Sequence, residues 1–139
     1  MSSSTLFYEL ATIYRPFINR LDKELNAYNL FSSQWRIMKL LLDKGPHTIS
    51  EIAHHNYVEK PTITRLVQKL IELEYVEAVT GEDKRVRMIQ LTDSGRAVCS
   101  KVIEKIDVFY RNLLDGVDED TQQEVTEALK KISENLKNY

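Results

Sequence analysis

Polar side chains that could read nucleic acid recur at helical spacing in the middle of the chain. Thr62, Thr64, Arg65 and Gln68 fall on one half of the helix that residues 61–73 would form, and the other half is wholly aliphatic. Hydroxyl, guanidinium and amide groups are suited to hydrogen-bonding base edges in a DNA groove. The same pattern also fits an ordinary surface helix, so the surrounding elements must distinguish the two interpretations.

A second group of charged side chains lies in a short polar turn. Lys84 and Arg85 belong to residues 80–85, which separate two strand candidates, residues 75–79 and 86–91. This pattern predicts a β-hairpin with a charged tip. Such a tip can place a cation in the narrow, negative minor groove of DNA. Charged hairpin tips are also common as plain solvated turns, so the hairpin alone leaves both interpretations open.

The sequence lacks the patterns of an enzyme or a metal site. It has no Gly-rich phosphate loop, no Gly-X-Ser-X-Gly segment and no Cys-X-X-Cys or His-X-X-X-His spacing. His54 and His55 are adjacent and would diverge by about 100° on a helix, so we expect them, with His47, at a surface or interface. Cys99 is a candidate redox sensor, but its aliphatic neighbours favour a buried side chain. We expect a protein that is not an enzyme and uses no cofactor or metal.

The elements that must position these groups follow from apolar periodicity and from helix caps. Helices are expected over residues 6–28, 34–43, 48–55 and 61–73, then the hairpin, then helices over residues 92–114 and from residue 118 onward. Thr48 and Glu51 form a capping box, and Ser32 or Ser33 is expected to cap the second helix. The order α-α-α-α-β-β-α-α predicts a mainly α fold with a small β-hairpin. The short helix, the tight connection, the following amphipathic helix and the hairpin together predict a winged helix-turn-helix. In this motif the second helix enters the major groove of DNA.

Length and charge bound the class of protein. The 139 residues suffice for one compact domain, and the single cysteine excludes an intrachain disulfide. The N-terminal residues lack the pattern of a signal peptide, and no apolar run reaches the ~20 residues that span a bilayer. We therefore expect a cytoplasmic protein without membrane contact. The net charge is −2, but residues 102–139 carry nine acidic and five basic residues, so the rest is slightly positive and leaves room for a local basic footprint.

Apolar stripes near both ends of the chain predict self-association. One stripe comprises Leu6, Leu10, Ile13, Phe17 and Leu21; the other comprises Val125, Leu129, Ile132 and Leu136. Both exceed what a small winged-helix domain needs to bury, which favours a homodimer formed through the chain ends. We expect a single domain over residues 1–139, with a winged helix-turn-helix part at residues 30–95 and a helical dimerisation part at residues 1–29 and 96–139.

Three segments resemble the MarR family of bacterial regulators. Residues 83–95 resemble the family's wing signature, Asp-X-Arg followed by Leu-Thr-X-X-Gly, and residues 33–37 and 61–67 resemble the starts of its second helix and its recognition helix. The resemblance covers the whole chain. It implies a homodimer, a palindromic operator in double-stranded DNA, repression, and often release by a small anionic or phenolic ligand.

The resemblance also implies roles for individual residues. Asp83 would orient Arg85 by an ion pair, Arg85 would enter the minor groove, and Arg87 would lie near phosphate. Lys60 and Lys69 would contact phosphate, and the polar half of the fourth helix would read bases. The candidate DNA-binding residues are therefore Lys60, Thr62, Thr64, Arg65, Gln68, Lys69, Asp83, Lys84, Arg85 and Arg87.

Two questions stay open at this point. Tyr8, Tyr14, Arg15 and Trp35 would line a partly polar, aromatic cleft between the first two helices that suits a phenolic acid, or they are simply core. The wing and fourth helix would bind DNA or, as an alternative, would form a module for protein–protein contact. Steep salt dependence of binding to a palindromic duplex distinguishes DNA binding from that alternative.

Overall fold

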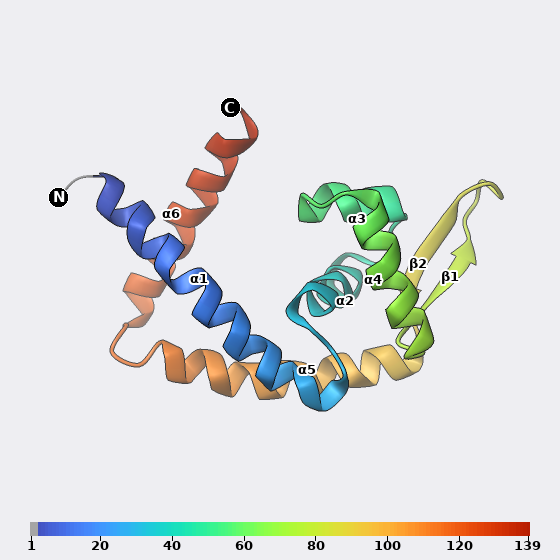
Figure 1. Cartoon of the computed structure of the whole chain (residues 1–139), viewed down its shortest axis with the longest axis horizontal. Helices are drawn as coiled ribbons and strands as arrows, with labels where there is room; N and C mark the ends of the chain where they lie inside the picture. Colours follow the sequence, from blue (N-terminus) through green and yellow to red (C-terminus); the bar gives the residue numbers. More distant parts are fainter. Residues whose placement is uncertain (1–2) are drawn as a thin grey trace. The chain divides into compact units, whose positions relative to one another are not determined.

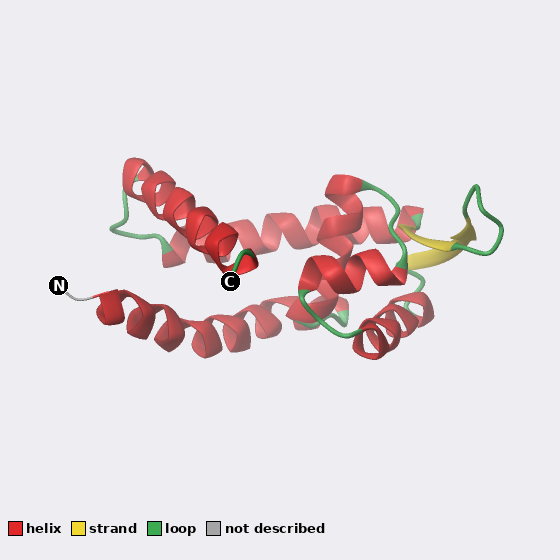
Figure 2. Cartoon of the chain, turned by 90° about the horizontal axis from the view of Figure 1, so that it is seen from above, coloured by secondary structure: helices red, strands yellow, loops and turns green. Residues whose placement is uncertain are grey.

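The computed structural model describes residues 3–139 and confirms the expected order of elements (Figure 1, Figure 2). The helices are α1 (Ser3–Leu25), the 3-10 turn η1 (Asn26–Tyr28), α2 (Ser32–Lys44), α3 (Ile49–Asn56), α4 (Lys60–Glu72), α5 (Asp93–Leu113) and α6 (Glu119–Lys137). The strands are β1 (Val76–Thr80) and β2 (Arg87–Leu91). The chain divides into two compact units, one ending at Ile106 and the other running from Asp107 to Tyr139. Over the described residues, no helix is long and apolar enough to cross a membrane.

The core of the first unit lies where α2, α3, α4 and the hairpin meet (Figure 1). Its fully buried side chains include Ile37 and Met38 from α2, Ile52 from α3 and Leu70 from α4. Each of these helices turns its apolar stripe inward, as the helical periodicity predicts. Burying one stripe of α4 leaves the opposite face free, which is the arrangement that a DNA-reading helix requires.

The start of α2 differs from the expected serine cap. The residue at the cap position is Phe31, whose backbone N–H donates to Oε1 of Gln34 over 2.9 Å. The N–H of Ser32 donates to Oδ1 of Asp22 over 2.7 Å. The prediction that Ser32 or Ser33 caps the helix was wrong, because carboxylate and amide oxygens already accept from these free amides.

The predicted capping box of Thr48 and Glu51 is confirmed. Thr48 Oγ1 accepts from the Glu51 N–H over 3.1 Å, and Glu51 Oε1 accepts from the Thr48 N–H over 2.9 Å. The backbone hydrogen bond from Thr48 is the main reason why the pKa of Glu51 lies below its ordinary value. At α6, Asp118 accepts from the Thr121 N–H over 2.8 Å, and this bond lowers the pKa of Asp118.

A third segment of the chain pairs with the middle of the hairpin's second strand. β1 and β2 pair antiparallel, with Val76 opposite Leu91. His47, in the loop before α3, exchanges two backbone hydrogen bonds with Ile89 of β2, at 3.1 and 2.8 Å. This bridge ties the hairpin to the connection between α2 and α3, so β2 is hydrogen-bonded on both of its edges, to β1 and to His47.

One junction joins α4, the hairpin and α5. The Tyr75 N–H donates to the Leu70 carbonyl over 3.0 Å, and the Thr92 N–H donates to the Tyr75 carbonyl over 3.1 Å. The Thr92 hydroxyl donates to the Glu74 carbonyl over 2.7 Å and accepts from the Gly95 N–H over 2.9 Å. Thr92 therefore caps α5 and fastens the end of α4 to the base of the hairpin with the same hydroxyl.

The glycine of this junction has a steric role. A Cβ built at Gly95 would collide with the carbonyl oxygen and carbonyl carbon of Tyr75. Backbone atoms cannot move aside as a flexible side chain can, so α5 approaches the start of β1 closely only because residue 95 has no side chain. The Thr-X-X-Gly pattern read from the sequence is thus explained by a cap and a close approach.

We expect Gly95→Ala to lower the free energy of unfolding by ~1–3 kcal/mol, the range for an overpacked buried site. Thermal or urea unfolding followed by circular dichroism measures this loss. Ser94→Ala, an exposed neighbour in the same helical turn, serves as the control and should change stability little. Equal stability of the two variants would contradict the close approach.

Candidate nucleic-acid interface

The polar face of α4 lies open to solvent as predicted, with one adjustment. Thr64, Arg65, Gln68 and Lys69 are exposed, whereas Thr62 is half-buried. The opposite stripe is buried at Ile63, Val67 and Leu70 and only half-buried at Leu66, Ile71 and Leu73. A contiguous surface of hydroxyl, guanidinium and amide groups therefore runs along α4, where it can meet base edges.

The direction of α4 is set by a tight turn after α3. Tyr57 adopts a left-handed conformation with φ of 55°, which stops α3. The Val58 N–H donates back to the Ala53 carbonyl over 3.1 Å, and the chain enters α4 at Lys60. Pro61 lies in the first turn of α4, where its missing N–H costs no helical hydrogen bond.

The cations of this face differ in how they are paired. Lys69 lies 3.7 Å from Glu72, and both side chains are exposed, so this ion pair is weak. Over residues 3–139, Lys60 and Arg65 form no ion pair. Their charges are therefore available to a phosphate or a base.

The hairpin tip carries the expected ion pair. Oδ1 of Asp83 accepts from the backbone N–H of Arg85 over 3.0 Å and from its Nε over 3.3 Å. These bonds, the backbone one first, hold the pKa of Asp83 below its ordinary value. The Arg85 side chain is 91% exposed, so the bond to Asp83 orients it without covering it.

Two further cations accompany Arg85 on the hairpin. Lys84 is exposed in the turn, and Arg87 is exposed at the first residue of β2, opposite Thr80. The structure brings Lys84, Arg85 and Arg87 together on one loop and strand end. Their contact with DNA stays a prediction.

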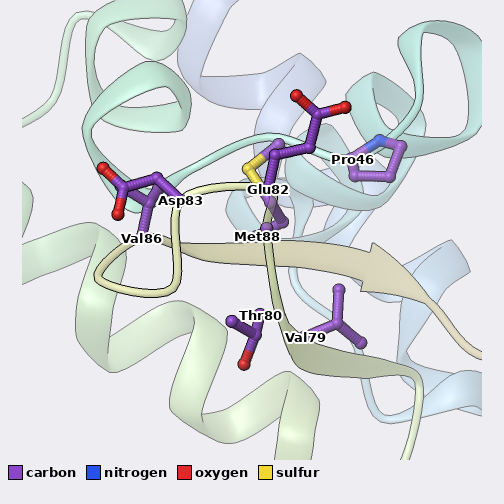
Figure 3. Close-up of a pocket in the computed structure, with 8 residues that line it drawn as sticks. Pro46, Val79, Thr80, Glu82, Asp83, Val86 and Met88 are labelled. Carbon is purple, nitrogen blue, oxygen red and sulfur yellow. The ribbon is translucent and has the colours of Figure 1, made fainter.

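The structure has a groove at the hairpin that the sequence did not predict (Figure 3). It has a volume of about 630 Å³ and is lined by Pro46, Val79, Thr80, Gly81, Glu82, Asp83, Val86 and Met88. Pro46 comes from the loop before α3 and the other residues from the hairpin, so no periodicity in the sequence marks it. Its walls are mainly apolar and its charged groups are carboxylates, which would repel an anionic ligand.

The four residues proposed for an effector cleft have different surroundings. Tyr8 and Tyr14 of α1 are 70% and 65% exposed, and Arg15 is exposed beside them. Trp35 of α2 is only 7% exposed and belongs to the core of the first unit. Trp35 therefore fits the core interpretation, whereas the three α1 residues form an open surface in the single chain.

Cys99 and the histidines have the surroundings that the sequence favoured. Cys99 is fully buried, and burial raises the pKa of its thiol to about 11, which disfavours the reactive thiolate. His54 and His55 are exposed on α3, and Nδ1 of His47 lies 2.7 Å from the Gly45 carbonyl. The described part of the chain contains no group of three side chains that could hold a metal ion.

Comparisons with known proteins agree with this geometry. The model of the MarR family matches residues 30–86. The HTH-type transcriptional regulator YwoH of Bacillus subtilis is 32% identical over 118 residues, which cover 84% of this chain and 86% of YwoH. The HTH-type transcriptional repressor IacR of Pseudomonas putida is 27% identical over 131 residues, covering 94% of this chain and 78% of IacR.

A solved structure of similar fold carries ligands. The Staphylococcus aureus MarR in complex with salicylate and kanamycin superposes with a TM-score of 0.87 at 27% sequence identity. The match covers 98% of this chain and 93% of that protein. The mainly helical fold with a two-stranded antiparallel hairpin is therefore the winged helix-turn-helix fold of that protein.

We expect the pKa of Asp83 to stay below its value in a peptide of residues 80–87 even in Arg85→Ala. The backbone N–H of residue 85, which lowers this pKa most, remains in the variant. Since the pKa is lowered in the folded protein, the turn gains stability at neutral pH and loses it only as the pH falls through that lowered value. An NMR titration of the Asp83 carboxyl measures this, and a pKa equal to that of the peptide would contradict the turn.

Proposed function

Because the chain belongs to the MarR family of DNA-binding transcriptional regulators, which are not enzymes, we propose that it represses transcription by binding a palindromic operator as a homodimer. The observation that carries this proposal is the exposed polar face of α4 with the oriented Arg85 on the neighbouring hairpin. The similarity to IacR, a transcriptional repressor, supports the sign of the regulation.

Major-groove reading is assigned to α4. Thr64, Arg65 and Gln68, which are exposed in the first three turns of α4, have the donors and acceptors that distinguish base pairs. Arg85 on the hairpin enters the minor groove, and the exposed lysines contact phosphate without reading sequence. In a two-fold dimer the two copies of α4 address half-sites about one helical turn apart, ~10 base pairs.

We expect Arg65→Ala to weaken operator binding by ~1–3 kcal/mol and to relax specificity at one base pair, as loss of a bidentate guanine contact does. Arg85→Ala should weaken binding with less effect on that base pair. Selection of bound duplexes from a random library, followed by titrations on the enriched palindrome, measures both effects. Arg20→Ala, an exposed α1 residue paired with Glu24, is the control. Unchanged affinity in Arg85→Ala would exclude the hairpin from the mechanism.

The homodimer is proposed from apolar surface that one chain leaves open. Leu6, Phe7 and Ile13 of α1 are exposed, and so are Val125 and Leu129 of α6. Ile132 is half-buried. These stripes repeat at helical spacing, which is typical of helices that pack on a partner. A second copy of this chain would remove them from water.

We expect Leu129→Glu to give a folded monomer. Leu129 is 43% exposed in the single chain, so the carboxylate harms only the association, where burial would leave it without a partner. Light scattering reports the mass and circular dichroism reports the fold. Asn135→Glu adds the same charge to α6 at an exposed polar position and should stay dimeric. A wild-type protein that is monomeric at micromolar concentration would refute the homodimer.

An effector site is proposed on α1. Tyr8, Tyr14 and Arg15 offer aromatic and cationic groups, and the salicylate-bound S. aureus MarR makes a phenolic acid a reasonable ligand. Since these side chains are exposed in one chain, we infer that the second protomer completes the site. A ligand held between protomers changes the separation of the two α4 helices and so weakens operator binding.

We expect salicylate to bind the free dimer more tightly than the operator-bound dimer, with a coupling of ~1–3 kcal/mol, and the operator to weaken salicylate binding by the same factor. Calorimetry on both forms measures this. Arg15→Ala should abolish salicylate binding, because it removes the cation that pairs with the carboxylate. Lys23→Ala, further along α1, should keep the wild-type affinity for salicylate. Equal affinity for both forms would exclude salicylate as the signal.

A further inference from the structure

Arg36 is a cation to which the sequence analysis assigned no role. It lies on α2 and is exposed, and its Nε donates to Oδ1 of Asn56, the last residue of α3, over 2.9 Å. The Nδ2 of Asn56 donates in turn to the Ile52 carbonyl over 2.8 Å. Because the amide nitrogen is held by its own helix, the amide oxygen faces the guanidinium, and Arg36 is fixed in direction by a chain of two hydrogen bonds.

The partner of Arg36 carries no charge. Over residues 3–139, Arg36 forms no ion pair, whereas Arg20, Lys39 and Arg85 each have a carboxylate within 4.0 Å. A guanidinium has five N–H donors, of which the bond to Asn56 uses one. The two terminal nitrogens remain free to make the paired hydrogen bonds that arginine forms with phosphate.

The residue that holds this side chain, Asn56, closely precedes the start of α4 in the chain. Asn56 and Lys60 are four residues apart, so even an extended chain separates their Cα atoms by at most about 14 Å. The left-handed Tyr57 folds this connection tightly, with Val58 bonded back to Ala53. When α4 enters a major groove by its first turns, the phosphates that border the groove lie beside this turn.

We propose that Arg36 binds a phosphate of double-stranded DNA and that Asn56 positions it. This deepens the operator binding proposed above and rests on it. The site recognises the backbone and not the bases, so it adds affinity on any duplex and fixes the register of α4 relative to the groove. A purely structural interpretation makes Arg36 a brace between α2 and α3.

The salt dependence of binding separates the two roles. Each phosphate contact steepens the plot of log binding constant against log salt concentration by about 0.9 on duplex DNA. We expect Arg36→Ala to reduce this slope by about 0.9 and to weaken the selected operator and an unrelated duplex by the same factor. Arg36→Gln retains a donor for Asn56 without the charge, so it should reduce the slope equally while the melting temperature stays at the wild-type value.

Two further variants complete the test. Asn56→Ala keeps the guanidinium of Arg36 but removes the hydrogen bond that orients it. This variant should bind DNA more weakly than the wild type, with a smaller change in the salt-dependence slope than Arg36→Ala shows. Arg20→Ala removes an exposed arginine from α1 and should leave the slope unchanged. If both Arg36→Gln and Arg36→Ala keep the wild-type salt dependence, the phosphate site is refuted. Arg36 would then serve only as a structural brace between α2 and α3. If the wild-type protein itself shows no salt-dependent binding to any duplex, the proposed function fails.

Discussion

The hydroxyl of Thr92 holds together the elements that would meet DNA. It accepts from the Gly95 N–H in the first turn of α5 and donates to the carbonyl of Glu74, two residues after the end of α4. Glu74 has a left-handed backbone with φ of 64°, so the chain reverses there from α4 into β1. The direction of the hairpin relative to α4 depends on this point, because β1 begins two residues later. A base-reading helix and a minor-groove arginine act on one duplex only if that angle is fixed.

The junction is stabilised from a second side. The hydroxyl of Tyr75 donates to the Tyr28 carbonyl in η1 over 2.9 Å, and burial raises the pKa of this phenol. The link joins the base of the hairpin to the segment between α1 and α2. A movement of α1 against α2 therefore has a direct connection to the hairpin, and in the proposed function this connection is the route by which a ligand on α1 would alter the spacing of α4 and the hairpin.

Charge in this protein is arranged locally. The net charge is −2, and acidic residues concentrate in the last third of the chain. In the proposed DNA complex, the cations of α4, the hairpin tip and Arg36 would each act on the phosphate or base nearest to them, because salt screens interactions beyond ~8–10 Å. Asp83 shows that an acidic residue can serve such a surface: its carboxylate offsets one positive charge at the tip, but its bonds to Arg85 define where the guanidinium points.

The sequence alone determined the features that depend on neighbours within one or two turns. The capping box of Thr48 and Glu51, the two-sided pattern of α4 and the hairpin with its charged tip were predictable, because helical and strand periods and turn signals span only a few residues. The Asp83–Arg85 pair was expected from the family resemblance alone. The family resemblance supplied what these local patterns could not, the assignment of roles on DNA.

The tertiary structure decided the features that join residues distant in sequence. Asp22 caps α2 from ten residues away, Asn56 holds Arg36 from twenty, and the carbonyl of Tyr75 requires a glycine at position 95. Periodicity marks which side of a helix is buried, but it does not name the atom that the side chain meets. That choice follows from how the helices pack, and the packing is fixed only when the whole core forms.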